Sequence, residues 1–192
     1  MLSYKDILLL YDGNTAVFES MSDDFDTHRS ATVMPVLPVE VSSFLSEKNT
    51  IYDGENFTAI TNNLLKPWVE NVPGDGEGEW IAIDVENTYP GFMQYRITGF
   101  LIVNGYVDFF RPHLFFANNR AKTLRIDNDK NNIHTETVLA DTPSMQYVPL
   151  PIQVEGGNPR FTFMIKDVYK GTKWNDTCIT MILPVYIQKE TH

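Results

Sequence analysis

The chain has 192 residues, with 25 Asp or Glu and 15 Lys or Arg, so its formal net charge is -10 at pH 7. A surface of this sign repels phosphate backbones and anionic headgroups, and we predict no nucleic-acid partner. No segment approaches the roughly 18 consecutive apolar residues of a spanning helix, so we predict no membrane insertion. Aromatic residues make up 12% of the chain, which favours strands over helices and a single all-β domain.

The first 35 residues differ from the rest, and we predict an N-terminal extension over residues 1–35. Within it, Ile7 to Tyr11 followed by Asp12-Gly13 has the pattern of one strand and a tight turn. Over residues 36–192, short apolar runs alternate with Gly, Pro, Asn and Asp, which predicts one β-sandwich domain. Helical periodicity is weak, and its best candidate is a turn or two around Glu55 to Leu65.

The predicted strands follow two patterns. Trp80 to Val85 alternates, with Ile81, Ile83 and Val85 expected to point inward. Gly99 to Val103 is almost continuously apolar, as in a central strand covered on both faces. Further strands are predicted at Leu124 to Ile126, Val148 to Ile152, Phe161 to Ile165 and Met181 to Ile187.

Four other features have a structural interpretation. Val72 to Glu79 is rich in Gly, but it is acidic and precedes a strand, so it predicts a turn and not a phosphate site. Asp127 to Asn132 begins like a calcium loop, yet Asn132 occupies the glycine position, which favours a solvated hairpin turn. Pro184 predicts an edge or a bulge in its strand. Cys178, the one cysteine, is expected to be a buried structural thiol.

The common enzyme signatures are missing from the sequence. The four histidines are scattered without the spacing of a metal site, and one cysteine cannot build a zinc centre. No nucleophile elbow, phosphate-binding glycine loop or zinc-protease motif is present. We therefore predict no metal, no cofactor and no enzymatic activity.

Five blocks along the chain carry a family likeness. They are Ser42 to Glu47, Trp68 to Ile81, Asn104 to Tyr106, Asn118 to Arg120 and Asp167 to Ile179. In this order, over about residues 40–187, they resemble the discoidin-like translocation domain, or NADase-type glycan-binding domain, of bacterial NAD glycohydrolases. The resemblance implies a jelly-roll β-sandwich of the galactose-binding-domain type, related to coagulation-factor type C domains and family 32 carbohydrate-binding modules. It also implies non-catalytic glycan or cell-surface binding, and the sandwich leaves no room for the NAD-cleaving domain.

Sugar recognition combines a flat aromatic ring with planar polar groups, and loops at one end of a sandwich supply both. The candidate ligand-binding residues are Trp68, Tyr106, Arg111, His113, Asn118, Arg120, Tyr169, Trp174 and Asp176.

Several candidates have a structural alternative. Trp68 is also a plausible core residue, Asp176 is suited to tying its loop to backbone amides, and Arg120 is suited to pairing with Asp167 or Asp176. The segment Phe109 to Phe116 is peculiar to this chain, because four phenylalanines flank an arginine and a histidine. An exposed cluster of those rings would form a binding surface, and we expect this segment to be the best place for a ligand.

Two functions follow from these observations. The first is a non-catalytic module of a bacterial protein that binds carbohydrate or a surface glycoconjugate. The alternative is a structural or protein-interaction domain that keeps the sandwich and has lost the sugar site. We favour an extracytoplasmic location, and the sequence leaves the oligomeric state open.

The resemblance also generates a prediction about calcium. Related sandwiches bind calcium at a turn before the Trp-Val-Glu block with help from a late glutamate, whereas here Thr58 to Asn63 occupies the turn and Met181 the glutamate position. Both carboxylate contributions are absent from these positions, so adding calcium should leave the melting temperature of the protein unchanged. A calcium titration followed by thermal unfolding tests this, and a rise of several degrees would contradict it.

Overall fold

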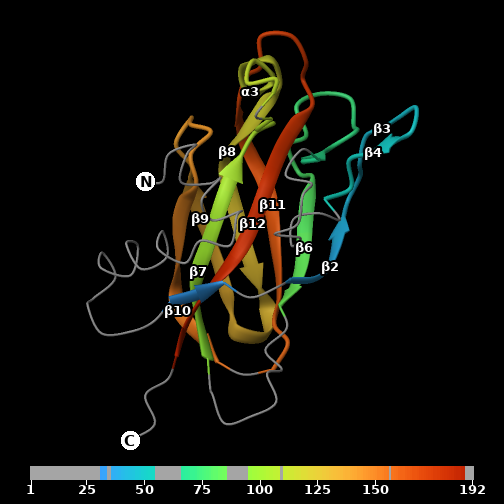
Figure 1. Ribbon diagram of the computed structural model, residues 1–192. Helices are drawn as coiled ribbons and strands as arrows, with labels where there is room; N and C mark the ends of the chain where they lie inside the picture. The colour runs from blue at the N-terminus through green and yellow to red at the C-terminus, as the bar shows by residue number, and fades with distance from the viewer. Residues whose placement is uncertain are drawn as a thin grey trace, which may run out of the picture.

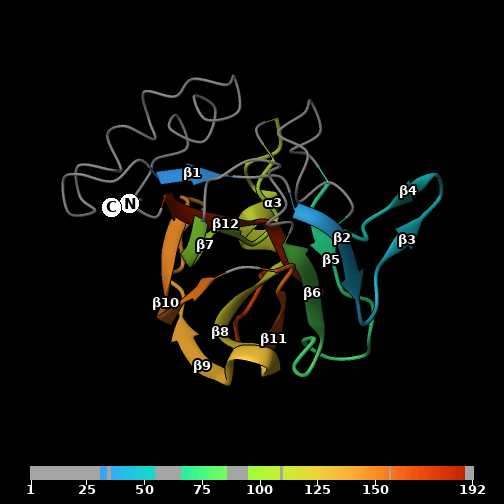
Figure 2. The same ribbon diagram turned by 90° about the horizontal axis from the view of Figure 1, so that it is seen from below.

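The computed structural model describes residues 31–33, 36–54, 66–85, 95–108, 110–155 and 157–188. The strands in these segments form two layers that face each other, as the view in Figure 2 shows. The first layer contains β10 (Gln146–Glu155), β7 (Tyr95–Asn104) and β12 (Thr177–Gln188), with β1 (Ala31–Val33) and β5 (Trp68–Val69) also paired to β12. The second layer contains β9 (Ile133–Val138), β8 (Asn119–Asn128), β11 (Arg160–Tyr169), β6 (Trp80–Val85) and β2 (Val36–Val41).

The two layers are joined at one end. There β12 pairs with β8 in parallel over two residues, Thr177 opposite Asn119 and Cys178 opposite Arg120. The same end carries the short helix α3 (Leu114–Ala117), at the top of Figure 1. The β3 (Ser46–Glu47) and β4 (Thr50–Ile51) hairpin also lies toward this end. We call this the loop end of the sandwich.

The predicted all-β sandwich is confirmed, and so are its strongest strands. β6 has the predicted bounds, and Ile81, Ile83 and Val85 are fully buried. The apolar run at residues 99–103 lies within β7, which is paired on one side with β10 and on the other with β12. The predicted hairpin turn at residues 127–132 is also confirmed. It contains the 3-10 turn η1 (Asp129–Asn131), and the Asn128 side chain accepts a hydrogen bond from the Asn131 amide at 3.0 Å.

Pro184 is paired on one side of its strand only. It is opposite Phe100 of β7, while on the other side of β12 the partners β1 and β5 cover only residues 185–187 and 178–179. Pro184 falls between these two stretches, so on that side it has no partner among the described strands, and such a position tolerates proline. A register shift follows between Val185 and Tyr186, so the prediction of a local edge or a bulge fits this part of β12.

Three expectations lie outside the described residues: the strand at Ile7 to Tyr11, the helical turn around Glu55 to Leu65 and the turn at Thr58 to Asn63. Ala31–Val33, from the end of the predicted extension, forms β1 and pairs with β12. The division at residue 35 stays a prediction.

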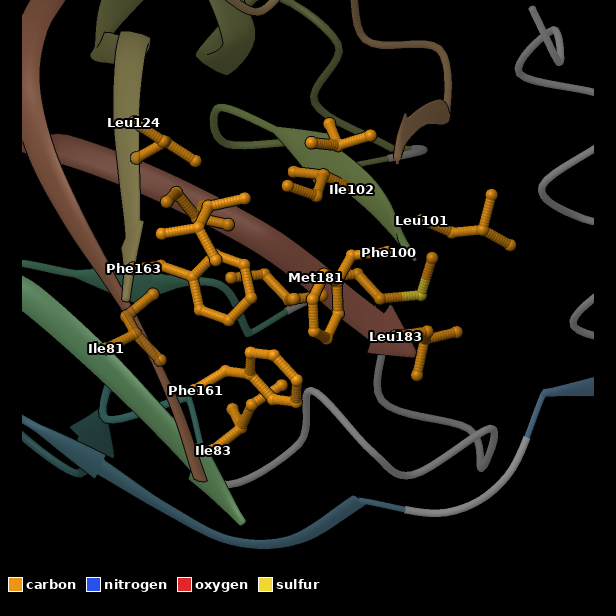
Figure 3. Close-up of a cluster of buried hydrophobic side chains, with 14 of the residues drawn as sticks. Ile81, Ile83, Phe100, Leu101, Ile102, Leu124, Phe161, Phe163, Met181 and Leu183 are labelled. Carbon is orange, nitrogen blue, oxygen red and sulfur yellow. The ribbon is translucent and has the colours of Figure 1, made fainter. Parts of the chain in front are cut away.

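Phenylalanines from facing layers meet in the centre of the core. Phe100 of β7 makes edge-to-face contacts with Phe161 and Phe163 of β11, with ring centroids 4.9 and 4.8 Å apart. Figure 3 shows these three rings among aliphatic side chains from both layers. Met181 stands at the position where related sandwiches carry the calcium-binding glutamate, and it is buried in the same core. Packing across the layers therefore fixes the strands that end in the functional loops.

At the loop end, Asn119 holds three segments together. Its side-chain amide donates to the Asn175 carbonyl at 2.6 Å and to the Asp75 carboxylate at 3.1 Å, and its oxygen accepts the Gly171 amide at 2.6 Å. The Lys170 ammonium pairs with the other Asp75 oxygen. A side chain at residue 171 would collide with backbone atoms of 117, 118 and 174, so only glycine allows this close approach. The loop between β11 and β12 is thus fixed along most of its length.

Glu70 fixes the neighbouring loop in a similar way. Its fully buried carboxylate accepts the Val72 amide at 2.8 Å and the Thr177 amide at 3.0 Å. Gly76, with a φ of +71°, packs so closely on it that an added Cβ would lie 2.6 Å from the Glu70 Cγ. Burial raises the pKa of Glu70, while the two amides oppose that rise. The predicted turn at Val72 to Glu79 is confirmed as a loop built on this carboxylate.

Replacing Phe100 with alanine removes the ring on which the two layers meet. We expect Phe100→Ala to lower the free energy of unfolding by about 3–5 kcal/mol, because a buried phenylalanine leaves a cavity that its neighbours cannot fill. Chemical denaturation measures the change. Val138→Ala, at a side chain that is 69% exposed, is the control and should change stability by less than about 0.5 kcal/mol. A loss below about 1 kcal/mol for Phe100→Ala would contradict the proposed core.

Asn119→Ala removes the three hydrogen bonds that hold the β11–β12 loop. We expect a loss of about 1–3 kcal/mol, because the Gly171 amide and the Asn175 carbonyl lose a partner in a buried setting. Hydrogen exchange at Gly171 should also become at least tenfold faster. Asn71→Ala, the same change at an exposed loop position, serves as the control. Unchanged exchange at Gly171 would show that the loop is held by other contacts.

Candidate functional site

A pocket of about 260 Å³ opens at the loop end of the sandwich. Its walls come from the β3–β4 hairpin, from β5, from the 106–118 segment that contains α3, and from the loop before β12. The lining residues are Leu45, Glu47, Tyr52, Val69, Tyr106, Arg111, Leu114, Asn118, Trp174 and Asp176. Four segments that are far apart in the sequence therefore build one cavity.

The structure brings five of the nine predicted ligand-binding residues into this pocket, and the other four lie outside its lining. The five are Tyr106, Arg111, Asn118, Trp174 and Asp176. The four are Trp68, His113, Arg120 and Tyr169.

Trp68 and Tyr169 have structural roles, because their side chains bond to backbone carbonyls of other segments. Trp68 is fully buried, and its indole nitrogen donates to the Ser43 carbonyl at 2.8 Å, in agreement with the core alternative. The Tyr169 hydroxyl donates to the Leu139 carbonyl at 2.9 Å. His113 is exposed at the start of α3 and makes no side-chain capping bond there.

Arg120 pairs with an acid, but with a different one from those expected. It donates through Nε and one terminal nitrogen to both oxygens of Asp141, at 2.9 and 2.8 Å. Its other terminal nitrogen donates to the carbonyls of Asn118 and Lys170, and the residue is almost completely buried. Such a bidentate pair fixes geometry, so Arg120 connects β8 to two loops and is not available to a ligand.

The hairpin wall contributes residues that the sequence analysis missed. The Leu45 amide donates to the Val69 carbonyl at 2.8 Å, the Tyr52 amide to the Leu45 carbonyl at 3.0 Å, and the Val69 amide to the Tyr52 carbonyl at 3.1 Å. These bonds dock the hairpin on β5 and carry Glu47 into the pocket. Because they join main-chain atoms, they leave no side-chain pattern from which the site could be predicted.

Asp108 fixes the backbone and the side chain of Arg111, which lines the pocket. Its side chain is 2% exposed and accepts the Phe110 and Arg111 amides at 2.8 and 3.0 Å, together with the Arg111 Nε at 2.7 Å. This hydrogen bond raises the pKa of Arg111, which stays charged. A terminal nitrogen of Arg111 lies 3.4 Å from the Tyr106 hydroxyl, and the guanidinium carbon is 5.9 Å from the centre of the Tyr106 ring. The Arg111 side chain is thus held at its Nε by Asp108, and one terminal nitrogen lies beside the Tyr106 hydroxyl in the pocket lining.

Tyr106 and Tyr52 form an aromatic pair in the pocket, with ring centroids 6.2 Å apart and planes tilted by 59°. Burial is the main reason that the pKa of Tyr106 is raised well above its ordinary value. Its hydroxyl is therefore neutral at physiological pH and able both to donate and to accept a hydrogen bond.

Trp174 is the exposed aromatic residue of the site, with 37% of its surface accessible. Its backbone amide donates to the Ala117 carbonyl at 2.9 Å, which fixes the loop against α3. The Lys173 ammonium lies 4.1 Å from the centre of the indole ring. A backbone that is held firmly here presents a large apolar ring to solvent and to the cavity.

Asp176 lies in the pocket beside Trp174. Burial raises the pKa of its carboxyl group, and the nearby Glu47 carboxylate raises it further. No ion pair joins Asp176 to a cation within the described segments. The carboxylate is therefore partly desolvated and, in these segments, has no cationic partner.

The absence of a metal stays a prediction. Among the residues that it describes, no three His, Cys, Asp or Glu side chains are grouped to hold a metal ion. Cys178 is fully buried as predicted, and burial raises the pKa of its thiol well above the ordinary value. None of the helices described is long and apolar enough to cross a membrane.

Comparison with solved structures shows likeness in the fold. The arabinofuranosyltransferase AftD from Mycobacteria has a TM-score of 0.50 and 14% identity over 80% of this chain, which spans only 10% of that protein. The family 32 carbohydrate-binding module from Streptococcus pneumoniae EndoD has a TM-score of 0.48 and 10% identity, covering 84% of this chain and 96% of the module. Allantoicase from Saccharomyces cerevisiae has a TM-score of 0.37 and 18% identity, covering 90% and 52%.

Comparison with curated protein sequences gives no match. The model of one protein family, however, matches residues 30–184, and its description is the NAD glycohydrolase translocation F5/8 type C domain. The match includes every pocket residue and most of the strands of both layers. The chain therefore belongs to the family of NAD glycohydrolase translocation F5/8 type C domains.

Proposed function

We propose that this chain is a non-catalytic carbohydrate-binding module that holds a sugar of a surface glycoconjugate in the loop-end pocket. The observation that supports this most is the composition of the cavity. Trp174, Tyr106, Arg111 and Asp176 come from two separate segments and line the same space. An aromatic ring stacks on the apolar C–H face of a pyranose, while guanidinium and carboxylate groups bond to its hydroxyls.

The volume of the pocket limits the size of the ligand. At about 260 Å³ the cavity lies just below the ~300 Å³ at which small-molecule pockets typically begin. A site of this size suits one terminal sugar and not a long oligosaccharide. The rest of a glycan would extend past the exposed edge of Trp174 into solvent.

Binding without catalysis fits the reactive groups near the pocket. The buried Cys178 thiol, with its raised pKa, is a poor nucleophile. Arg120 is held by Asp141 and two carbonyls, and Arg111 by Asp108. A module that recognises surface sugars would act outside the cytoplasm, which is the location that we propose.

A second candidate function is a protein-interaction domain. It is favoured by exposed phenylalanines on the segment next to the pocket: Phe110 is 78% exposed and Phe116 is 57% exposed. Exposed rings of this size are common at the centres of protein interfaces. In this case a double Phe110→Ala, Phe116→Ala variant would lose a protein partner and keep any sugar binding.

Trp174→Ala is the test of the proposed sugar site. We expect the variant to lose at least tenfold in affinity for any glycan that the natural protein retains on a glycan array, because the stacking surface is removed. Tenfold corresponds to about 1.4 kcal/mol. Isothermal titration with the best array ligand measures the change.

Ile152→Ala is the matched control, since it removes an apolar side chain that is 51% exposed on β10, outside the pocket lining. Its affinity should equal that of the natural protein. If Trp174→Ala binds the ligand as well as the control does, the sugar lies elsewhere and the pocket is not the site. Failure of the natural protein to bind any glycan would favour the protein-interaction function.

A further inference from the structure

The charges around the pocket are unevenly distributed. Glu47 and Asp176 line the cavity, and among the residues that the structure describes Arg111 is the only cationic one in its lining. The Arg111 charge is already matched by the buried Asp108 carboxylate at 2.7 Å. The two lining carboxylates are therefore left without a compensating positive charge in the cavity wall.

The groups that face Asp176 from the neighbouring elements are also acidic. Glu47 approaches from the β3–β4 hairpin and Glu70 from the segment after β5, and both interact with Asp176 electrostatically. On the side of β12 the neighbour is the buried Cys178 thiol. Of the two lysines in the same loop, Lys173 lies over the Trp174 ring and Lys170 pairs with Asp75.

A partly buried carboxylate with no cationic partner is costly, because it has lost water and gained no opposite charge. A ligand that brings an ammonium group into the cavity would remove this cost. The Tyr52 ring adds attraction, since an aromatic face favours a cation, whereas the rings of Tyr106 and Trp174 already lie under Arg111 and Lys173. A ligand with a carboxylate would instead add a third uncompensated negative charge.

We infer that the pocket prefers a sugar that carries a free ammonium group, an amino sugar without an N-acetyl group, and that it rejects sugar acids. The inference rests on the proposed function, because it names the class of ligand for the same site. Asp176, with Glu47 beside it, binds the ammonium group, and Trp174 stacks on the ring. The net charge of -10 strengthens the effect by attracting cationic ligands to the surface.

This arrangement has a defined pH dependence. The ammonium group binds the charged form of Asp176, so affinity is full between the pKa of that carboxyl group and the pKa of the ligand's own ammonium group. It declines as the pH falls through the carboxyl pKa. Because the pKa of Asp176 in the free protein is raised, the decline begins at a higher pH than for an ordinary aspartate at about 3.9. Affinity for an N-acetylated sugar should change less over the same range.

Titration calorimetry with six probes of four kinds tests the inference. The probes are the methyl glycosides of glucosamine and galactosamine, those of their N-acetyl forms, the methyl glycoside of glucuronic acid, and choline. We expect the free amines to bind at least tenfold more tightly than the N-acetyl forms, and glucuronic acid not to bind. Choline, which has the ammonium group but no sugar ring, should bind at least tenfold more weakly than the amino sugars. The preference for amines should also weaken as salt is added.

Asp176→Asn should reduce the affinity for the amino sugars at least tenfold and leave that for the N-acetyl forms within about twofold. The control is Asp129→Asn, which removes the same charge from a side chain that is 95% exposed and outside the pocket lining. This control should keep the preference for amines, and thermal unfolding should show that both variants are folded.

The outcomes separate this inference from the proposed function. Equal affinity for amines and N-acetyl forms would overturn the inference and leave the sugar site intact. Tight binding of choline, or an equal loss of affinity in Asp129→Asn, would also overturn it, because ammonium recognition would then not depend on a sugar or on Asp176. If none of the sugars binds, the proposed function itself fails.

Discussion

The structure depends on the short contact between β12 and β8 at the loop end of the sandwich. Only two residue pairs are involved, yet they bring the β11–β12 loop against the beginning of β8 and the end of α3. Asn119 makes this contact rigid, because its side chain bonds to the loop on either side of Trp174. Without this connection the two layers would share their core but not a common end, and the pocket residues would lie on independent loops.

The strands and the core follow from local patterns, because a half-buried strand shows its periodicity in its own sequence. Ile81, Ile83 and Val85 were predictable for that reason. The site was predictable only in part. Aromatic and planar polar residues in loops pointed to Tyr106, Arg111 and Trp174, but Glu47 and Tyr52 enter the pocket through backbone pairing of the hairpin with β5. Likewise, Arg120 pairs with Asp141, which lies 21 residues away in the sequence and does not belong to a common motif with Arg120.

The loop between β11 and β12 combines two roles that the sequence analysis treated as alternatives. Gly171 lets the loop approach α3 closely, and Lys170 pairs with Asp75, so the first half of the loop is structural. Trp174 and Asp176 then extend from the fixed backbone into the pocket. The segment from Phe109 to Phe116 contributes Arg111 and Leu114 to the opposite side. The ligand site is therefore shared by both segments, and rigidity of one is a condition for recognition by the other.

The residues that hold the pocket in place therefore differ from the residues that select its ligand. The anchors, such as Asn119, Glu70 and Asp108, are buried and bond to backbone amides or carbonyls, so replacing them disturbs the fold. Glu47 and Trp174 are partly or largely exposed and act through charge and ring surface. Substitutions of Glu47 or Trp174 alter the electrostatic field and the shape of the cavity at little cost in stability. A sandwich built in this way can keep one architecture while the charge of its pocket determines which sugar it accepts.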